Sequence, residues 1–190
     1  MTGVVYSMQY TSSNWASSTG GGMETLWAPW RMAYIGKAQL GADSGGCIFC
    51  TAFQAGEGGG GLVVHRRPMA LCMLNRFPYN PGHVMVAPER HGGELAELES
   101  AELGAVIDEL KLATRVLQAE LGCEGLNGGW NQGRAAGAGI DSHLHFHLVP
   151  RWNGDTNFMP VLADLKVVPE HLEVTASRLR GAFQAHPEWA

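Results

Sequence analysis

The stretch that decides the fold is His143-Leu144-His145-Phe146-His147-Leu148-Val149-Pro150-Arg151, in which three histidines alternate with large apolar residues. Side chains of a β-strand point alternately to its two faces. A strand here places the three histidines on one face and the apolar residues on the other, whereas a helix would scatter the histidines around its axis. A plain strand with a polar, solvated face is the alternative. Because this run uses three of the eight histidines, we predict that the face needs imidazoles.

Length and composition are typical of one globular domain. The chain has 190 residues, of which 45% are hydrophobic and 16% are charged. The net charge of −5 gives no general attraction to nucleic acid or to an anionic membrane. No apolar run approaches the ~20 residues of a membrane-spanning helix, and the N-terminus lacks the pattern of a signal peptide. We therefore expect a cytoplasmic protein with no nucleic-acid or membrane partner.

The spacing of helical and strand patterns predicts the organisation of the chain. Residues 1–22 are rich in Ser, Thr and Gly and are expected to form a flexible tail, with a single domain at 23–190. Apolar residues at helical spacing predict a long helix, capped by Ser100 and ended after Leu121 by Gly122, and a C-terminal helix starting near Pro169. Strands are predicted at residues 62–65, 69–74, 83–87 and 125–130. This mixed order favours an α+β fold with an antiparallel sheet.

The cysteines suggest a metal site. In a chain without a secretion signal they are better interpreted as thiols or metal ligands than as disulfides. Cys47 and Cys50 are three residues apart, so two thiolates can share one tetrahedral metal. Two imidazoles can complete the shell, with His91 and one histidine of the 143–147 run as candidates. A redox dithiol and two packed cysteines are the alternatives, and we rank the dithiol lowest because no helix start is evident after Cys50.

The loop before the histidine strand, residues 131–142 (NQGRAAGAGIDS), is rich in glycine. Glycines let the backbone approach a ligand and turn its N–H groups toward an anion, while Asn131, Arg134 and Ser142 could add donors. A flexible turn is the alternative. A donor-rich loop that leads into three imidazoles indicates a phosphate held beside a nucleophile or an acid–base group. Further upstream, Asn75 and His83 flank the turn segment NRFPYNPGH.

The chain resembles the histidine-triad (HIT) family, whose signature is His-φ-His-φ-His-φ-φ with φ apolar. Residues 143–149 fit every position of that signature. The upstream blocks match as well, namely Cys-x-x-Cys, the Leu-Asn…Pro-Gly-His turn and Pro-x-x-His ending at His91. The resemblance covers about residues 26–183. Within the family, residues 26–31 and 150–158 are most similar to the bacterial diadenosine tetraphosphate phosphorylase branch.

The resemblance implies a fold, a partner and an activity. Family members form an α+β domain that pairs into a homodimer with a continuous antiparallel sheet. They bind purine nucleotides or dinucleoside polyphosphates and cleave at the α-phosphate. By the resemblance, His145 is the nucleophile that forms a nucleotidyl-histidine, which water or phosphate then releases. His147 and His83 line the same phosphate site, Asn75 contacts the ribose and Asn131 contacts a phosphate oxygen. A neutral imidazole is a competent nucleophile at neutral pH.

The resemblance also implies a structural zinc and no organic cofactor. In zinc-containing members, the metal ligands match Cys47, Cys50, His91 and His143. Such a zinc would brace the strand that carries the nucleophile.

The chain departs from the family pattern just before the histidines. Many members have a polar pair such as Gln-Ser there, whereas this chain has Gly139 and Ile140. Backbone N–H groups of Gly137 and Gly139, or the Arg134 side chain, are the expected substitutes. The departure leaves open the leaving-group preference and the acceptor, and with them a phosphoramidate hydrolase or a nucleotide-binding regulatory protein with little catalysis. A metalloenzyme in which the three histidines bind a catalytic metal is a separate alternative.

Overall fold

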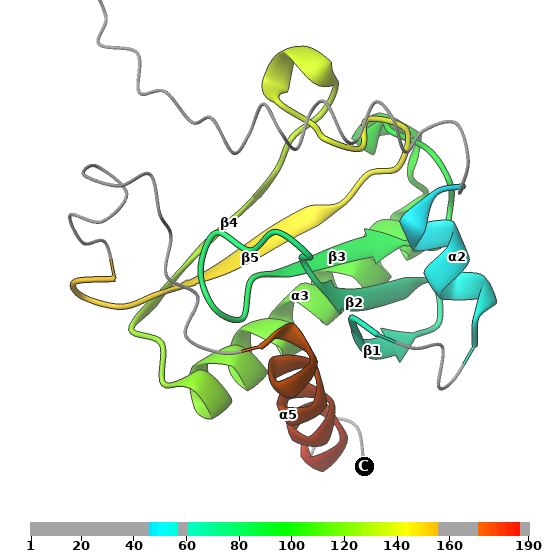
Figure 1. Cartoon of the computed structure of the whole chain (residues 1–190). Helices are drawn as coiled ribbons and strands as arrows, with labels where there is room; N and C mark the ends of the chain where they lie inside the picture. Colours follow the sequence, from blue (N-terminus) through cyan, green and yellow to red (C-terminus); the bar gives the residue numbers. More distant parts are fainter. Residues whose placement is uncertain (1–45, 57–60, 156–170, 187–190) are drawn as a thin grey trace, which may run out of the picture.

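The computed structural model describes residues 46–56, 61–155 and 171–186. The predicted tail at 1–22 and the predicted helix start at Pro169 lie outside these residues. Two 3-10 turns, η1 (Leu95–Glu97) and η2 (Arg134–Ala136), accompany the regular elements (Figure 1). Those elements are, in order, α2 (Ile48–Gln54), β1 (Val63–Arg67), β2 (Ala70–Leu74), β3 (Val84–Pro88), α3 (Ser100–Leu121), β4 (Gly125–Trp130), β5 (Phe146–Arg151) and α5 (Leu172–Ala185).

The strands form one antiparallel sheet in the order β1-β2-β3-β5-β4. This arrangement confirms the predicted α+β fold. The first hairpin turns later than predicted, because Arg66 and Arg67 pair with Leu71 and Ala70 instead of leaving the ladder. Only Pro68 and Met69 form the turn, and Met69 has a φ of 66°.

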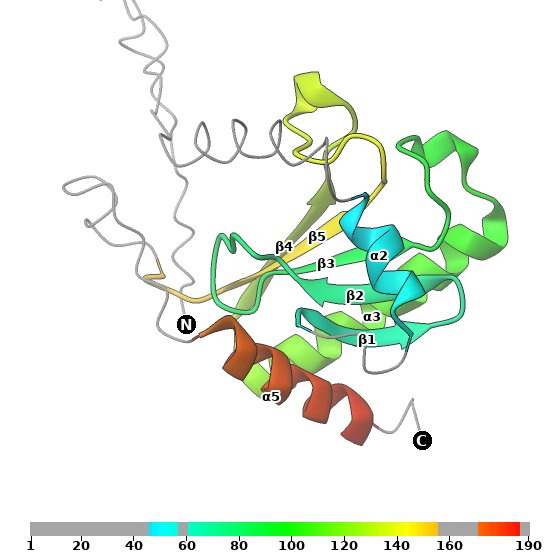
Figure 2. The same cartoon turned by 45° about the vertical axis from the view of Figure 1, so that its right-hand side comes forward.

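Helices cover both faces of the sheet (Figure 2). On one face, α3 and α5 pack against alternate residues of the strands, including Val84, Val86 and Phe146. On the other face, Phe49 of α2 packs against the intervening residues, including Met85. The period of two along each strand therefore separates a large core from a smaller one. The three histidines belong to the face with the smaller core.

The histidine run is only partly regular strand. We predicted a strand from His143, but β5 begins at Phe146. The reason is that the Leu144 N–H donates to the carbonyl of Gly92, 2.7 Å away, in the loop after β3. The sheet ladder between β3 and β5 is limited to residues from Phe146 onward. His143 and His145 therefore lie on an extended segment pinned to the His91 loop.

The long helix α3 matches its predicted end better than its predicted start. Gly122 adopts the left-handed conformation that ends the helix, as predicted. The N-cap is Glu99 rather than Ser100, because its N–H donates to Glu102 at 2.8 Å in a capping box. Within the part of the chain that the structure describes, no helix combines the length and the apolar character needed to cross a bilayer.

A buried polar cluster joins α3 to the edge of the sheet. Glu109 of α3 is fully buried and accepts hydrogen bonds from His65 Nδ1 and Arg67 Nε, both at 2.8 Å. The imidazole of His65 stacks on Phe183 of α5 at 4.8 Å. The sequence had suggested only the apolar positions of this helix. The buried carboxylate adds a specific link between β1, α3 and α5.

The contact between the His91 loop and the segment before His143 makes a testable prediction. A Cβ at Gly93 would lie 2.2 Å from the carbonyl oxygen of Asp141, which is backbone and cannot move aside cheaply. Gly93→Ala should therefore lower the free energy of unfolding by about 1–3 kcal/mol. At Gly104, inside α3, no atom lies within 4 Å of an added Cβ. Gly104→Ala should therefore raise the free energy of unfolding by about 0.5–1 kcal/mol.

Chemical denaturation of both variants measures the difference. Equal stability of the two variants would contradict the close approach of these backbones.

Candidate functional site

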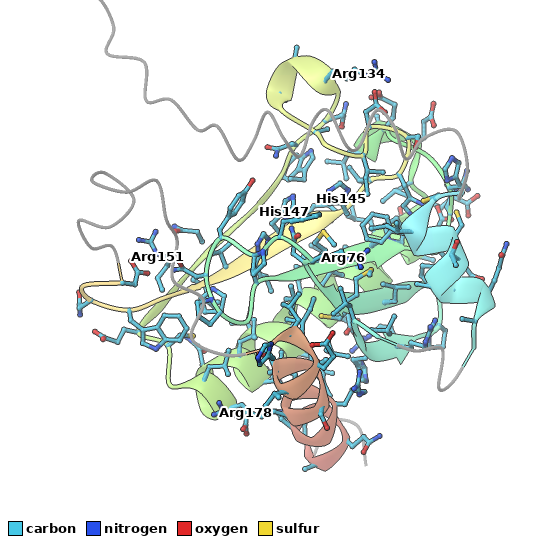
Figure 3. All side chains as sticks on the ribbon, in the orientation of Figure 1. Arg76, Arg134, His145, His147, Arg151 and Arg178 are labelled. Carbon is cyan, nitrogen blue, oxygen red and sulfur yellow. The ribbon has the colours of Figure 1, made fainter. Side chains whose placement is uncertain are left out.

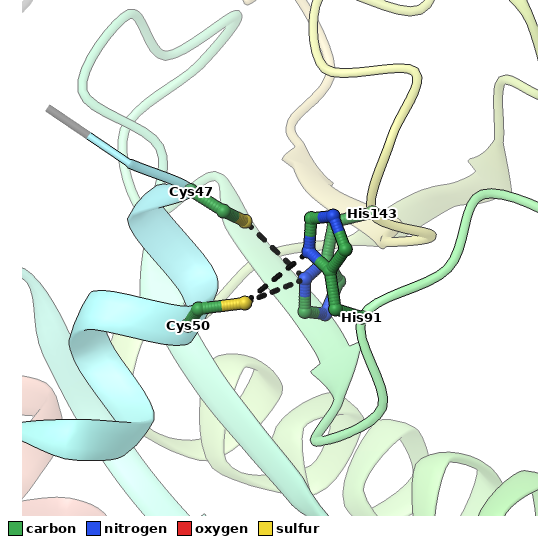
Figure 4. A group of neighbouring side chains, drawn as sticks. All are labelled: Cys47, Cys50, His91 and His143. Carbon is green, nitrogen blue, oxygen red and sulfur yellow. Dashed lines mark hydrogen bonds between the residues drawn. The ribbon is translucent and has the colours of Figure 1, made fainter. Parts of the chain in front are cut away.

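Two cysteines and two histidines converge from three separate segments (Figure 4). Cys47 and Cys50 lie at the start of α2, His91 follows β3, and His143 precedes β5. Their ligand atoms all lie within 4.8 Å of one another. The Sγ–Nδ1 distances are 3.3 Å for Cys47–His143, 3.2 Å for Cys50–His91 and 3.6 Å for Cys50–His143. A tetrahedral zinc with ordinary bond lengths separates sulfur and nitrogen ligands by about 3.5 Å, so the four donors fit zinc.

The hydrogen bond of His143 Nε2 leaves the lone pair of Nδ1 available to bind a metal. Its Nε2 lies 2.9 Å from the carbonyl oxygen of Pro88, so Nε2 carries the proton and donates. Nδ1 then presents its lone pair to the two sulfurs. Burial alone would raise the pKa of the Cys47 thiol, but the interaction with His143 and backbone hydrogen bonds lower it to about 6. Burial and the neighbouring Cys47 raise the pKa of Cys50. A bound cation would relieve the repulsion between two thiolates.

One argument against a redox dithiol was wrong. The sequence showed no helix start at this motif, yet Cys50 lies within α2, which begins at Ile48. Helix α2 has only 7 residues, and the burial of Phe49 and Ala52 against the sheet fixes it. Two imidazoles nevertheless face the sulfurs, and this donor set is typical of zinc rather than of a dithiol.

His145 keeps the lone pair of one ring nitrogen free of hydrogen bonds to the described residues. Its Nδ1 lies 2.9 Å from the carbonyl oxygen of His143, so Nδ1 carries the proton and donates. The lone pair is thereby assigned to Nε2, which makes no hydrogen bond to the described residues. The imidazole is only 4% exposed and lies against Phe49, with ring centroids 5.1 Å apart. Burial lowers the pKa of His145, so the ring is neutral and nucleophilic at pH 7.

His147 and His83 form a hydrogen-bonded pair beside His145. The backbone N–H of Tyr79 donates to His83 Nδ1 at 3.1 Å, so the proton of His83 is on Nε2. That Nε2 donates to His147 Nδ1 at 2.9 Å, and the proton of His147 is therefore on its own Nε2. Burial, followed by the neighbouring His145, lowers the pKa of His147 to about 4. The chain of donors fixes His147 as a neutral hydrogen-bond donor at the site.

The structure brings Asn75 and Asn131 to the edges of the histidine group. The N–H of Asn75 donates to the carbonyl of His83 at 2.8 Å, and its Oδ1 accepts from the N–H of Phe77. Asn131 directly follows Trp130 at the end of β4. Because Trp130 pairs with Phe146 on the neighbouring strand, Asn131 is placed beside the segment that carries His145.

The glycine loop is arranged differently from the expected phosphate nest. Arg134 is exposed at the outer end of the loop and pairs with Asp141 at 2.7 Å (Figure 3). The N–H of Gly137 donates to the carbonyl of Arg134 at 2.9 Å within the turn. Gly139 follows in the same loop. The structure therefore does not bring Arg134 or the N–H of Gly137 to the histidines, and their binding to phosphate stays a prediction.

A cavity of about 390 Å³ lies beside α2 and is lined by residues of β1, β2 and β3. Met85 lines the cavity and pairs with His147 on the neighbouring strand, so the cavity lies next to the face that carries the histidines. This cavity was not predicted from the sequence, although the alternate apolar residues of β2 and β3 were a usable signal. Its walls are mainly apolar and comprise Ile48, Thr51, Ala52, Ala55, Gly61, Leu62, Val63, Met73, Leu74, Arg76, Met85, Leu172 and Glu173.

Comparison with known proteins places this geometry in a family. The HIT domain family model matches residues 61–154. A protein of Mycobacterium tuberculosis named AP-4-A phosphorylase is 38% identical over 173 residues, which cover 87% of each chain. An asymmetrical bis(5'-nucleosyl)-tetraphosphatase of Schizosaccharomyces pombe is 29% identical over 50% of this chain and 52% of its own.

Solved structures show the same fold. A hypothetical histidine triad nucleotide-binding protein of Sulfolobus tokodaii has a TM-score of 0.59 at 25% identity, covering 73% of this chain and 92% of its own. A zinc-bound histidine triad family protein of Mycobacterium smegmatis has a TM-score of 0.57 at 24% identity, covering 72% of this chain and 92% of its own.

The four-donor cluster predicts the metal content of the purified protein. We expect about one zinc per chain, and Cys50→Ser should lose most of it because a ligand is removed. Cys123→Ala removes a cysteine outside the cluster and should retain the metal. Elemental analysis and thermal unfolding with and without a chelator provide the measurement. A chelator that removes zinc with no change in melting temperature would contradict a structural role.

Proposed function

The chain belongs to the HIT domain family, and we propose that it cleaves dinucleoside polyphosphates of the diadenosine tetraphosphate type at the α-phosphate. Relatives with a named activity include a phosphorylase and a tetraphosphatase, and the chain is an enzyme of this hydrolase or phosphorylase class. The observation that carries the proposal is the lone pair of His145 Nε2, fixed by the bond from Nδ1 to the carbonyl of His143.

In the first step, His145 Nε2 attacks the α-phosphorus. A P–N bond forms while the bond from the α-phosphorus to the bridging oxygen breaks, and the rest of the substrate leaves as a nucleoside triphosphate. The Nε2–H of His147 donates to an oxygen of the reacting phosphate and stabilises the charge that develops there. Such reactions depend mainly on position and on charge stabilisation.

In the second step, an acceptor attacks the same phosphorus and the P–N bond breaks, which returns the electron pair to His145. Water as acceptor yields a nucleoside monophosphate, and inorganic phosphate yields a nucleoside diphosphate. The phosphorylase name of the Mycobacterium tuberculosis relative favours phosphate.

The apolar cavity beside His147 supports nucleoside binding. We propose that a purine base enters it, because ligand sites of this kind combine apolar walls with a few polar groups. Asn75 then lies between the cavity and His83 and contacts the ribose. Asn131 contacts a phosphate oxygen.

We further propose a homodimer and a structural zinc. β4 is an edge strand of the sheet, and a second copy could continue the sheet from it. The zinc would be held by Cys47, Cys50, His91 and His143, and it would connect α2, the His91 loop and the segment that leads to His145. In this position the metal supplies rigidity rather than a reacting group.

The role of His145 predicts the outcome of one substitution. His145→Ala should reduce cleavage of diadenosine tetraphosphate by several orders of magnitude, because the nucleophile is lost, while the protein remains folded. Chromatography of the products, with and without inorganic phosphate, measures the rate of cleavage and identifies the products. Diphosphate products that require phosphate indicate phosphorolysis. His186→Ala, at the end of α5, is the control and should retain activity; full activity of His145→Ala would refute the assignment.

The depressed pKa values of the two histidines predict an unusual pH profile. Burial lowers the pKa values of both imidazoles, that of His147 to about 4, so each ring takes up its proton at a lower pH than an ordinary imidazole. The kcat/KM value, which reports groups of the free enzyme, should therefore begin to fall only at a pH below the pKa of an ordinary imidazole, about 6.5. If the nucleophile had an unshifted pKa of about 6.5, kcat/KM would instead fall roughly tenfold by pH 5.5. A steady-state pH series separates these results.

A further inference from the structure

The ring of Tyr79 occupies a position that the mechanism above leaves unused. It stacks on His83, with ring centroids 4.9 Å apart and an angle of 22° between the planes, and lies 6.4 Å from His147. The residue is nevertheless 45% exposed. One part of the ring thus covers the histidine pair, and the remainder is open to solvent.

Tyr79 is separate from the proposed site of the first base. The cavity lies on the β1–β2 side of Met85 and His147, and Tyr79 does not line it. With one base in the cavity and the α-phosphate at His145, we take the exit for the remaining phosphates to run past His147, whose ring lies 5.1 Å from that of His83. The segment that carries Tyr79 lies next to that exit, since its backbone bonds to His83.

We propose that Tyr79 stacks on the second nucleobase of the dinucleoside polyphosphate, the base that departs with the leaving polyphosphate. This inference rests on the proposed function. An aromatic ring offers a π-face to any base, which holds the base without reading its sequence of donors and acceptors. Tyr79 would thereby select substrates that carry a nucleoside at both ends of the phosphate chain over mononucleotides.

A purely positioning role for Tyr79 makes a different prediction. If the ring only held His83 in place, its loss would slow every substrate by the same factor, because His83 serves the common α-phosphate. A stacking role affects only substrates with a second base. The ratio of two specificity constants therefore separates the two roles.

The experiment compares diadenosine tetraphosphate with adenosine 5'-tetraphosphate, which has the same number of phosphates and no second nucleoside. For the wild type, Tyr79→Leu and Tyr79→Phe, kcat/KM for diadenosine tetraphosphate is divided by kcat/KM for adenosine 5'-tetraphosphate. Tyr79→Leu should lower the ratio about tenfold, within the range that removal of a base-stacking aromatic residue gives. Tyr79→Phe should retain the ratio, because the ring remains. Phe77→Leu, an exposed ring on the same segment, should retain it as well.

An unchanged ratio in Tyr79→Leu would overturn the inference, whether both substrates slow equally or neither does. Failure of the proposed function has a distinct result, since the wild type would then cleave neither nucleotide. In that case calorimetric binding of the same two nucleotides decides. Stacking is supported if the wild type binds the dinucleotide more tightly than adenosine 5'-tetraphosphate and Tyr79→Leu loses this preference. Equal binding of the two nucleotides by the wild type refutes it.

Discussion

The hydrogen bond from His145 Nδ1 to the backbone carbonyl of His143 is the interaction on which the site depends. It is possible only because the two histidines are two residues apart on an extended segment, so that both imidazoles share one face. The bond selects the tautomer of His145 and leaves the lone pair on Nε2. The same logic assigns the other imidazoles, since Pro88 orients His143 and the chain from Tyr79 through His83 orients His147.

This arrangement links stability to chemistry. The apolar residues between the histidines enter the core with α3 and α5, and the histidines face α2. Any shift of register by one residue would exchange the two faces and destroy both core and site. The four-donor cluster stands at one end of the histidine segment, and the His83–His147 pair stands at the other. Nε2 of His145 therefore lies between the four-donor cluster and the His83–His147 pair, and both groups restrict its position.

Patterns with a strict period were predictable from the sequence. The histidine alternation, the existence of the long helix α3 and the Gly122 cap depend on local geometry, and the structure follows them. The buried face of α3 was predicted less well, because Ile107 is exposed. Features that depend on tertiary contact were not predictable. Phe49 stabilises the short helix α2 only by packing on the sheet, and Glu109 is buried only because His65 and Arg67 reach it. The pairing of Arg134 with Asp141 likewise appears only once the loop is folded.

The stereochemical course at the α-phosphorus tests the central claim most directly. Each in-line displacement at phosphorus inverts its configuration, so transfer through His145 involves two inversions. The substrate would be a chiral α-phosphorothioate analogue of diadenosine tetraphosphate, with phosphate as the acceptor and the diphosphate product analysed by phosphorus NMR. The account predicts net retention of configuration. Net inversion would mean that the acceptor attacks directly, without a nucleotidyl-histidine, and would contradict it.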